Sequence, residues 1–153
     1  LAVQLEAGYA SNVVALPEEE YVLPIGKADI KREGSDVTIV SFGKIIKQAY
    51  KAAEELEKED ISCEIIDLRT IRPMDHETIL ESVKKTNRLV ILEESWPFGN
   101  IATEITYQVQ SKAFDYLDAP IEKINTADTP APYSPVLLEE WLPIPLGLSL
   151  IYL

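Results

Sequence analysis

Residues 65–75, IIDLRTIRPMD, place a polar cluster at the end of an apolar run. Asp67 is followed by Arg69 and Arg72, and Pro73 stops the chain before a predicted helix start. Two arginines can clamp a carboxylate or a phosphate through paired hydrogen bonds, which would make a binding site. The segment offers no evident nucleophile, base or metal ligand. We therefore favour a structural role, in which Asp67 pairs with one arginine and fixes the end of the strand.

Three other residues could take part in acid–base chemistry. His76, the single histidine, lies in the first turn of a predicted helix, and we expect it at the surface. Glu93 and Glu94 are adjacent at the end of a predicted strand, so their side chains point to opposite faces and form a poor acid–base pair. We expect one of the two to be buried and hydrogen-bonded.

Cys63 is the single cysteine of the chain. One cysteine excludes an internal disulfide and a site built from several cysteines, which favours an intracellular protein. Cys63 alternates with Ile61 and Ile65 on a predicted strand. We therefore expect it to pack as a small apolar residue and not to act as a nucleophile.

The charge of the chain limits its partners. Fourteen basic residues against 26 acidic ones give a net charge of -12, which argues against nucleic acid or an anionic membrane because phosphates attract lysine and arginine. A basic protein partner is compatible with this charge. We expect no signal peptide in residues 1–16 and no membrane span, because no apolar run reaches about 18 residues.

Alternating strand and helix patterns position these residues. The order β-α-β-α-β-α-β predicts parallel strands joined by right-handed crossovers, and thus a three-layer α/β/α sandwich. Residues 27–33, KADIKRE, can add an edge strand. Residues 1–20 are irregular, residues 21–143 form the domain, and residues 144–153 are an apolar tail. Strands are predicted at 36–42, 61–68, 88–94 and 120–126, and helices at 45–58, 75–87 and 101–117, the second of them capped by Asp75. Pro130, Pro132 and Pro135 are expected to break up the region after the last strand.

Ligands of such sheets usually bind beyond the carboxyl ends of the strands. The residues there that could line a pocket are Ser41, Gly43, Arg69 and Glu94. Neither GxGxxG nor GxxxxGK[ST] occurs, which disfavours dinucleotide or ATP binding. In the loop SWPFGN, Trp96 and Phe98 are candidates for a contact with another subunit, although packing within the domain would also explain them.

Six motifs occur together in one order. They are VLPIGKADIKREGSDVTIVSFG, IDLRTIRPMD, RLVILEES, the glycine-bearing loop that enters a helix, YLDAPIEKI and ADTPAPYSPVLLEEWLP. Over roughly Pro17 to Pro143 the chain resembles the transketolase C-terminal domain family, and within it most closely the beta subunit of the pyruvate dehydrogenase decarboxylating component. Relatives continue after Pro143 into a charged amphipathic helix, whereas this chain continues into the apolar residues 144–153.

The resemblance implies a five-stranded, mostly parallel sheet with one antiparallel edge strand. It also implies a parent enzyme of the bacterial cytoplasm or mitochondrial matrix that uses thiamine diphosphate and magnesium, both bound outside this chain. No catalytic, cofactor-binding or metal-binding residue is therefore expected here. The implied partners are an alpha subunit, a second beta subunit and the dihydrolipoyl acyltransferase. Asp118, in LDAP, resembles a position that the family uses for docking.

Two alternatives stay open. The chain could be the matching domain of another thiamine diphosphate enzyme, such as a branched-chain 2-oxo acid dehydrogenase or a deoxyxylulose phosphate synthase. It could also be a free-standing, non-catalytic module that senses a ligand at its strand ends.

Overall fold

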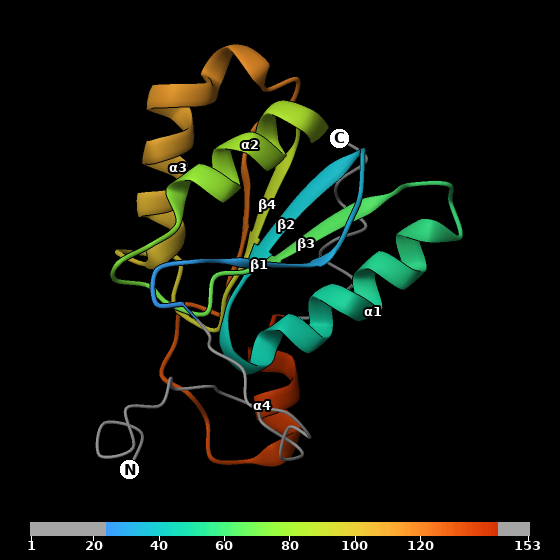
Figure 1. The fold of residues 1–153 in the computed structure, drawn as a ribbon. Helices are drawn as coiled ribbons and strands as arrows, with labels where there is room; N and C mark the ends of the chain where they lie inside the picture. The colour runs from blue at the N-terminus through green and yellow to red at the C-terminus, as the bar shows by residue number, and fades with distance from the viewer. Residues whose placement is uncertain (1–23, 144–153) are drawn as a thin grey trace, which may run out of the picture.

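The computed structural model describes residues 24–143, and the predictions for residues 1–20 and 144–153 lie outside this range. A five-stranded mixed sheet forms its centre, in the order β1-β3-β2-β4-β5 (Figure 1). β1 pairs antiparallel with β3, and the other neighbours are parallel, which confirms the predicted sheet. The strands are β1 (Asp29–Arg32), β2 (Val37–Ser41), β3 (Cys63–Asp67), β4 (Leu89–Leu92) and β5 (Glu122–Ile124).

Helices cover both faces of the sheet and complete the predicted three layers. α1 (Ile46–Glu57) packs on one face, and α2 (His76–Thr86) and α3 (Ile101–Ala113) pack side by side on the other (Figure 1). Short 3₁₀ turns precede α1 and follow α3, as η1 (Gly43–Ile45) and η2 (Phe114–Tyr116). Within residues 24–143 no helix has the length and apolar character that a membrane crossing requires.

Consecutive strand residues supply opposite sides of the core. Ile39 and Ile65 pack under α1, whereas their neighbours Val40 and Ile66 pack under α2 and α3. This follows from the two-residue period of a strand, in which successive side chains point to opposite faces. Strands that are buried on both faces therefore appear in the sequence as near-continuous apolar runs.

Polar residues define the helix ends. Asp75 caps α2 by accepting a hydrogen bond from the Thr78 amide, as predicted, and Asn100 caps α3 by accepting one from the Thr103 amide. Asn87 ends α2 in the left-handed conformation, with φ of 62°.

The prediction for the region after β5 was wrong in one respect. We expected its prolines to break it up, but residues 135–141 form a helix, α4 (Pro135–Trp141). Proline is tolerated in the first turn of a helix because the amide it lacks has no partner inside the helix. β5 is also shorter than the predicted strand over 120–126.

Gly34 lies where the chain passes from β1 to β2. A Cβ atom there would lie 2.2 Å from the Cys63 carbonyl carbon and 2.2 Å from the Glu64 nitrogen. These are backbone atoms of β3, so no side chain can move aside to make room. Glycine at this position therefore permits the close approach of two backbones.

Replacing Gly34 with alanine should displace β3 and lower the free energy of unfolding by roughly 2–3 kcal/mol or more. The measurement is chemical unfolding followed by circular dichroism. Ser35→Ala, at the exposed neighbouring residue, is the matched control and should change stability little. A Gly34→Ala variant as stable as the original chain would contradict this reading.

Candidate functional site

The carboxyl ends of β2, β3 and β4 meet at one edge of the sheet. At this edge Ser41 is fully buried, and its hydroxyl donates to the Leu92 carbonyl at 2.9 Å. Its own carbonyl accepts from the Leu68 amide at 3.0 Å. Ser41 thus joins the ends of the three strands, and both of its polar groups are used in doing so.

Gly43 and Glu94 follow the ends of β2 and β4. Gly43 has a φ of +68°, which favours glycine, although a Cβ there would meet no atom within 4 Å. The Glu94 carboxylate is partly exposed, and its Oε1 lies 4.0 Å from the Lys44 Nζ. Among the four candidate pocket residues, Glu94 lines a hollow at this edge.

Arg69 turns away from that hollow. Its Nη2 lies 2.5 Å from Asp29 Oδ2 on the edge strand β1. Our expectation that Asp67 would pair with an arginine was wrong, because Asp67 Oδ1 instead accepts the Arg69 backbone amide at 3.0 Å. Arg69 has a φ of 55°, so its backbone takes the left-handed conformation at the strand end.

The rest of the IIDLRTIRPMD segment also binds the chain that leads into β1. Thr70 Oγ1 accepts from the Gly26 amide at 3.0 Å, and Asp75 Oδ2 accepts from the Ala28 amide at 3.0 Å. Thr70 also donates to the Pro73 carbonyl at 2.9 Å. The polar cluster is therefore a clamp for residues 26–29.

Asp75 is a buried carboxylate with its charge retained. Burial alone would raise its pKa, but hydrogen bonds from Ala28 and Thr78 and the nearby charge of Lys27 hold the pKa below its usual value. The carboxylate caps α2 and holds the lead into β1 at the same time.

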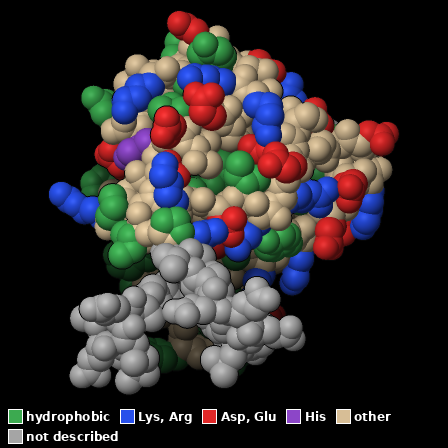
Figure 2. Space-filling view, in the orientation of Figure 1, with side chains coloured by type: hydrophobic (Ala, Val, Ile, Leu, Met, Phe, Trp, Pro, Cys, Tyr) green, Lys and Arg blue, Asp and Glu red, His purple; other side chains and the backbone are tan. Residues whose placement is uncertain are grey.

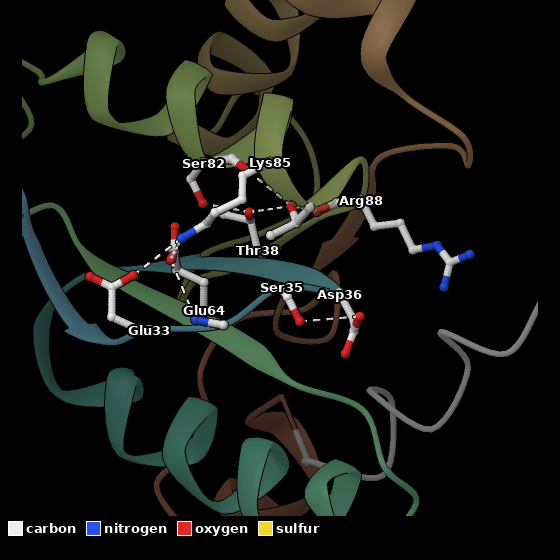
Figure 3. Close-up of polar contacts among 10 residues, drawn as sticks. Glu33, Ser35, Asp36, Thr38, Glu64, Ser82, Lys85 and Arg88 are labelled. Carbon is white, nitrogen blue, oxygen red and sulfur yellow. Dashed lines mark hydrogen bonds and ion pairs between the residues drawn. The ribbon is translucent and has the colours of Figure 1, made fainter.

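A second buried carboxylate, Glu64, lies under α2 (Figure 3). Its Oε2 accepts from the Gly34 amide at 3.4 Å and from Lys85 of α2, which also donates to Glu33 at 3.2 Å. This site was not predicted from the sequence, although Glu64, a charged residue within the apolar strand CEIID, was a visible signal.

The environment of Glu64 and Lys85 favours a structural role over a catalytic one. Burial would raise the pKa of Glu64, but Lys85 and neighbouring hydrogen bonds lower it, while the bond to Glu64 raises the pKa of Lys85. General acids and bases work best with pKa values near neutrality, and these two groups move away from it. Next to them, the Thr38 hydroxyl shares a 2.6 Å hydrogen bond with the Ser82 hydroxyl (Figure 3). It shares a second one, also of 2.6 Å, with the Thr86 hydroxyl.

Glu93 is the buried member of the Glu93–Glu94 pair, as expected. It is 0% exposed, and its Oε1 accepts from the Ala102 amide at 3.3 Å and the Asn125 side chain at 3.0 Å. It therefore joins the end of β4 to the start of α3 and to the residue after β5.

Neither Cys63 nor His76 is placed to act as a nucleophile, an acid or a base. Cys63 is fully buried, and burial raises the pKa of its thiol to about 11, which opposes formation of a nucleophilic thiolate. His76 is partly buried, less exposed than we expected, and its Nδ1 has no hydrogen-bond partner. Within residues 24–143, no three His, Cys, Asp or Glu side chains group so as to hold a metal ion.

An aromatic hollow of about 360 Å³ lies beyond the end of β4. The indole nitrogens of Trp96 and Trp141 both donate to the Thr129 carbonyl, at 3.0 and 2.8 Å. Phe98 is 90% exposed beside them. Trp96 and Phe98 were predicted from the sequence as contact candidates, whereas Trp141 was not, because α4 was not expected. The residues that line the hollow include Glu94, Trp96, Phe98, Asn100, Ala131 and Trp141.

Asp118 lies at the other end of β4, where that strand begins. Both of its carboxylate oxygens accept from Arg88, at 3.0 and 3.3 Å, and both side chains are about half exposed. On the face in Figure 2, acidic and basic side chains are interspersed, so the negative net charge does not form one continuous patch there.

Comparison with known proteins decides the family. The family model described as "Transketolase, C-terminal domain" matches residues 26–147. The chain belongs to this family. This confirms the resemblance found in the sequence, and the strand-end features described above are those of a transketolase C-terminal domain.

Named relatives of this transketolase C-terminal domain are beta subunits. It is 56% identical over 117 residues to the pyruvate dehydrogenase E1 component subunit beta of Dictyostelium discoideum, covering 76% of this chain and 33% of that protein. It is 56% identical over 125 residues to the corresponding subunit of Rhizobium meliloti, covering 82% and 27%. The acetoin:2,6-dichlorophenolindophenol oxidoreductase subunit beta of Bacillus subtilis is 48% identical over 130 residues, covering 85% and 38%. The chain thus spans about a third of the length of these relatives.

A solved structure has the same fold. The chain described as "Split gene transketolase, inactive beta4 tetramer" superposes with a TM-score of 0.74 at 25% identity. The superposition covers 90% of this chain and 43% of that one.

Removing the Arg69 side chain should loosen β1. We expect Arg69→Ala to lower the free energy of unfolding by about 1 kcal/mol, because it leaves Asp29 without this partner. Thermal unfolding is the measurement. Arg72→Ala is the control, since Arg72 is exposed and has no ion-pair partner within residues 24–143. Equal losses of stability in Arg69→Ala and Arg72→Ala would contradict the role of Arg69 in holding β1.

Asp75 and Glu64 should make the domain sensitive to acid. Their folded pKa values lie below the unfolded ones, so they stabilise the fold above about pH 4 and lose that effect as pH falls through the folded pKa. We expect the free energy of unfolding to fall with pH in that acidic range, and less steeply in Asp75→Asn. Urea unfolding at several pH values tests this, with Asp115→Asn, at an exposed residue, as control. An unchanged slope in Asp75→Asn would overturn the assignment.

Proposed function

We propose that the chain is the C-terminal domain of the beta subunit of a thiamine diphosphate-dependent 2-oxo acid dehydrogenase that acts on pyruvate. Its role is to assemble the subunits and to dock the dihydrolipoyl acyltransferase. The observation that carries the proposal is the 56% identity to pyruvate dehydrogenase beta subunits from two distant organisms. Because mitochondrial and bacterial subunits are both among the relatives, the proposed location is the mitochondrial matrix or the bacterial cytoplasm.

The polar groups of the domain support a role without catalysis by this chain. Ser41, Arg69, Glu64 and Asp75 each bind another part of the fold. These groups are used within the fold, which supports a site for thiamine diphosphate and magnesium outside this chain. In the proposal both bind elsewhere in the parent enzyme, and this chain alone has no turnover.

The exposed apolar residues support a role in assembly. Tyr133, Val136 and Leu137, which are close in sequence around the start of α4, are largely exposed. Apolar residues exposed side by side are typical of interaction surfaces. The alpha subunit and a second beta subunit are the partners that the proposal assigns to them.

The charge supports docking of a basic partner. The chain carries a net charge of -12, and the half-exposed Asp118 presents a carboxylate at one end of the sheet. Opposite charge speeds encounter and selects the partner. The peripheral-subunit-binding domain of the acyltransferase is basic in this family and would meet both features.

A second candidate is the matching domain of another oxidoreductase of this type. The 48% identity to the acetoin:2,6-dichlorophenolindophenol oxidoreductase subunit beta favours it. The domain would then serve the same assembly role beside a different substrate pocket. Reconstitution with the remaining subunits of each enzyme, followed by turnover of pyruvate or acetoin, distinguishes the two.

The docking proposal predicts that changes to Asp118 and to its ion-pair partner Arg88 affect binding of the acyltransferase domain differently. Asp118→Asn should weaken binding of the peripheral-subunit-binding domain by roughly tenfold, about 1.4 kcal/mol. Arg88→Ala should leave binding intact, because it frees the Asp118 carboxylate. Light scattering with and without the basic domain, at low and high salt, gives the masses and affinities.

Asp115→Asn is the control for the loss of one negative charge nearby. Equal weakening by Asp118→Asn and Arg88→Ala would assign the pair to the fold and not to docking. Decarboxylation of pyruvate by the purified chain with thiamine diphosphate would contradict the role without catalysis.

A further inference from the structure

The aromatic hollow is held rigidly in shape. Trp96 and Trp141 come from different segments, yet both indole nitrogens donate to the same carbonyl, that of Thr129. The Asn100 side chain donates to the Trp96 carbonyl at 2.8 Å and caps α3 with its Oδ1. Side chains fixed in this way lose little conformational entropy when a ligand binds.

The hollow combines aromatic rings with a carboxylate. Trp96, Phe98 and Trp141 line it together with Glu94. The Glu94 contact with Lys44 is long, at 4.0 Å, and the Lys44 side chain is 67% exposed. An exposed pair at this distance contributes little. The carboxylate is therefore available to a cation that also contacts the rings.

Aromatic faces attract cations through the negative potential above the ring, and most strongly for tryptophan. A guanidinium group suits this hollow better than an ammonium, because it is planar, stacks on aromatic faces and pairs with a carboxylate through two hydrogen bonds.

The charge of the chain indicates where the guanidinium comes from. Glu94 places a negative charge in the hollow and the chain carries a net charge of -12, so a basic protein is attracted to this surface. We propose that the aromatic hollow binds an arginine side chain of a basic partner protein, held between Trp96, Phe98 and Trp141 and paired with Glu94. The hollow lies at the end of β4 opposite Asp118. The proposal is therefore independent of the docking role assigned to Asp118.

The two tryptophans of the chain both line the hollow, so intrinsic tryptophan fluorescence reports on it directly. The probe is a short glycine–serine peptide with one central arginine, compared with the same peptide carrying neutral citrulline. We expect a saturable fluorescence change with the arginine peptide and roughly tenfold weaker binding of the citrulline peptide. Equal affinities, or no saturable change with either peptide, would overturn the proposal.

Variants test which groups bind the cation. Glu94→Gln should lower the affinity for the arginine peptide to that for the citrulline peptide, whereas Glu54→Gln, an equal charge change on the exposed face of α1, should leave it unchanged. Phe98→Ala should also weaken binding, and it should not unfold the domain because Phe98 is 90% exposed.

An unchanged affinity in Glu94→Gln would contradict the proposal. It would also be wrong if light scattering showed an oligomer that Phe98→Ala dissociates while no peptide binds, because the hollow would then be a contact between copies of this chain.

Discussion

Two buried carboxylates hold the edge strand β1 in place. Asp75 accepts from the Ala28 amide just before β1, and Glu64 accepts from the Gly34 amide just after it. Both also bind α2, Asp75 as its cap and Glu64 through Lys85. The edge strand β1, helix α2 and the neighbouring strand β3 are thus joined by the same two charges. Removing a partner from such a group is costly, because it leaves a buried charge uncompensated.

At the carboxyl edge of the sheet, several of the described polar side chains are likewise used within the fold. In many open α/β sheets the loops beyond the strands hold a ligand. Here the corresponding polar groups complete the fold: Ser41 joins neighbouring strands, Arg69 pairs with Asp29, and Glu93 holds the start of α3. Ser41 and Arg69 are thereby paired within the fold, whereas Glu93 keeps one buried carboxylate oxygen, Oε2, without a hydrogen-bond partner. The surfaces around the sheet are then where this domain can act on other proteins.

The sequence predicted the layers of the fold well, because they depend on periods of two and 3.6 residues within short segments. Partners across the fold were harder to predict. The ion pair of Arg69 with Asp29 joins residues far apart in the chain, and Asp67, the near neighbour, was the wrong choice. Glu64 stands out in the sequence as a charged residue within an apolar strand. Its partner Lys85 could not be identified from the sequence. Helix α4 was missed because three prolines suggested irregular structure, and Trp141 was missed with it.

The two ends of β4 present different chemistry to their surroundings. Near its start, Asp118 and Arg88 form a half-exposed ion pair, a polar contact that salt weakens. Beyond its end, rigid indoles and an exposed phenylalanine surround one carboxylate. Contacts with such rings depend on desolvation and on ring potential, which salt screens less than it screens exposed ion pairs. The fully buried strand between them, Leu89–Leu92, separates the two surfaces without a shared partner. Changes at one surface should therefore add to changes at the other without coupling, as expected for distant sites.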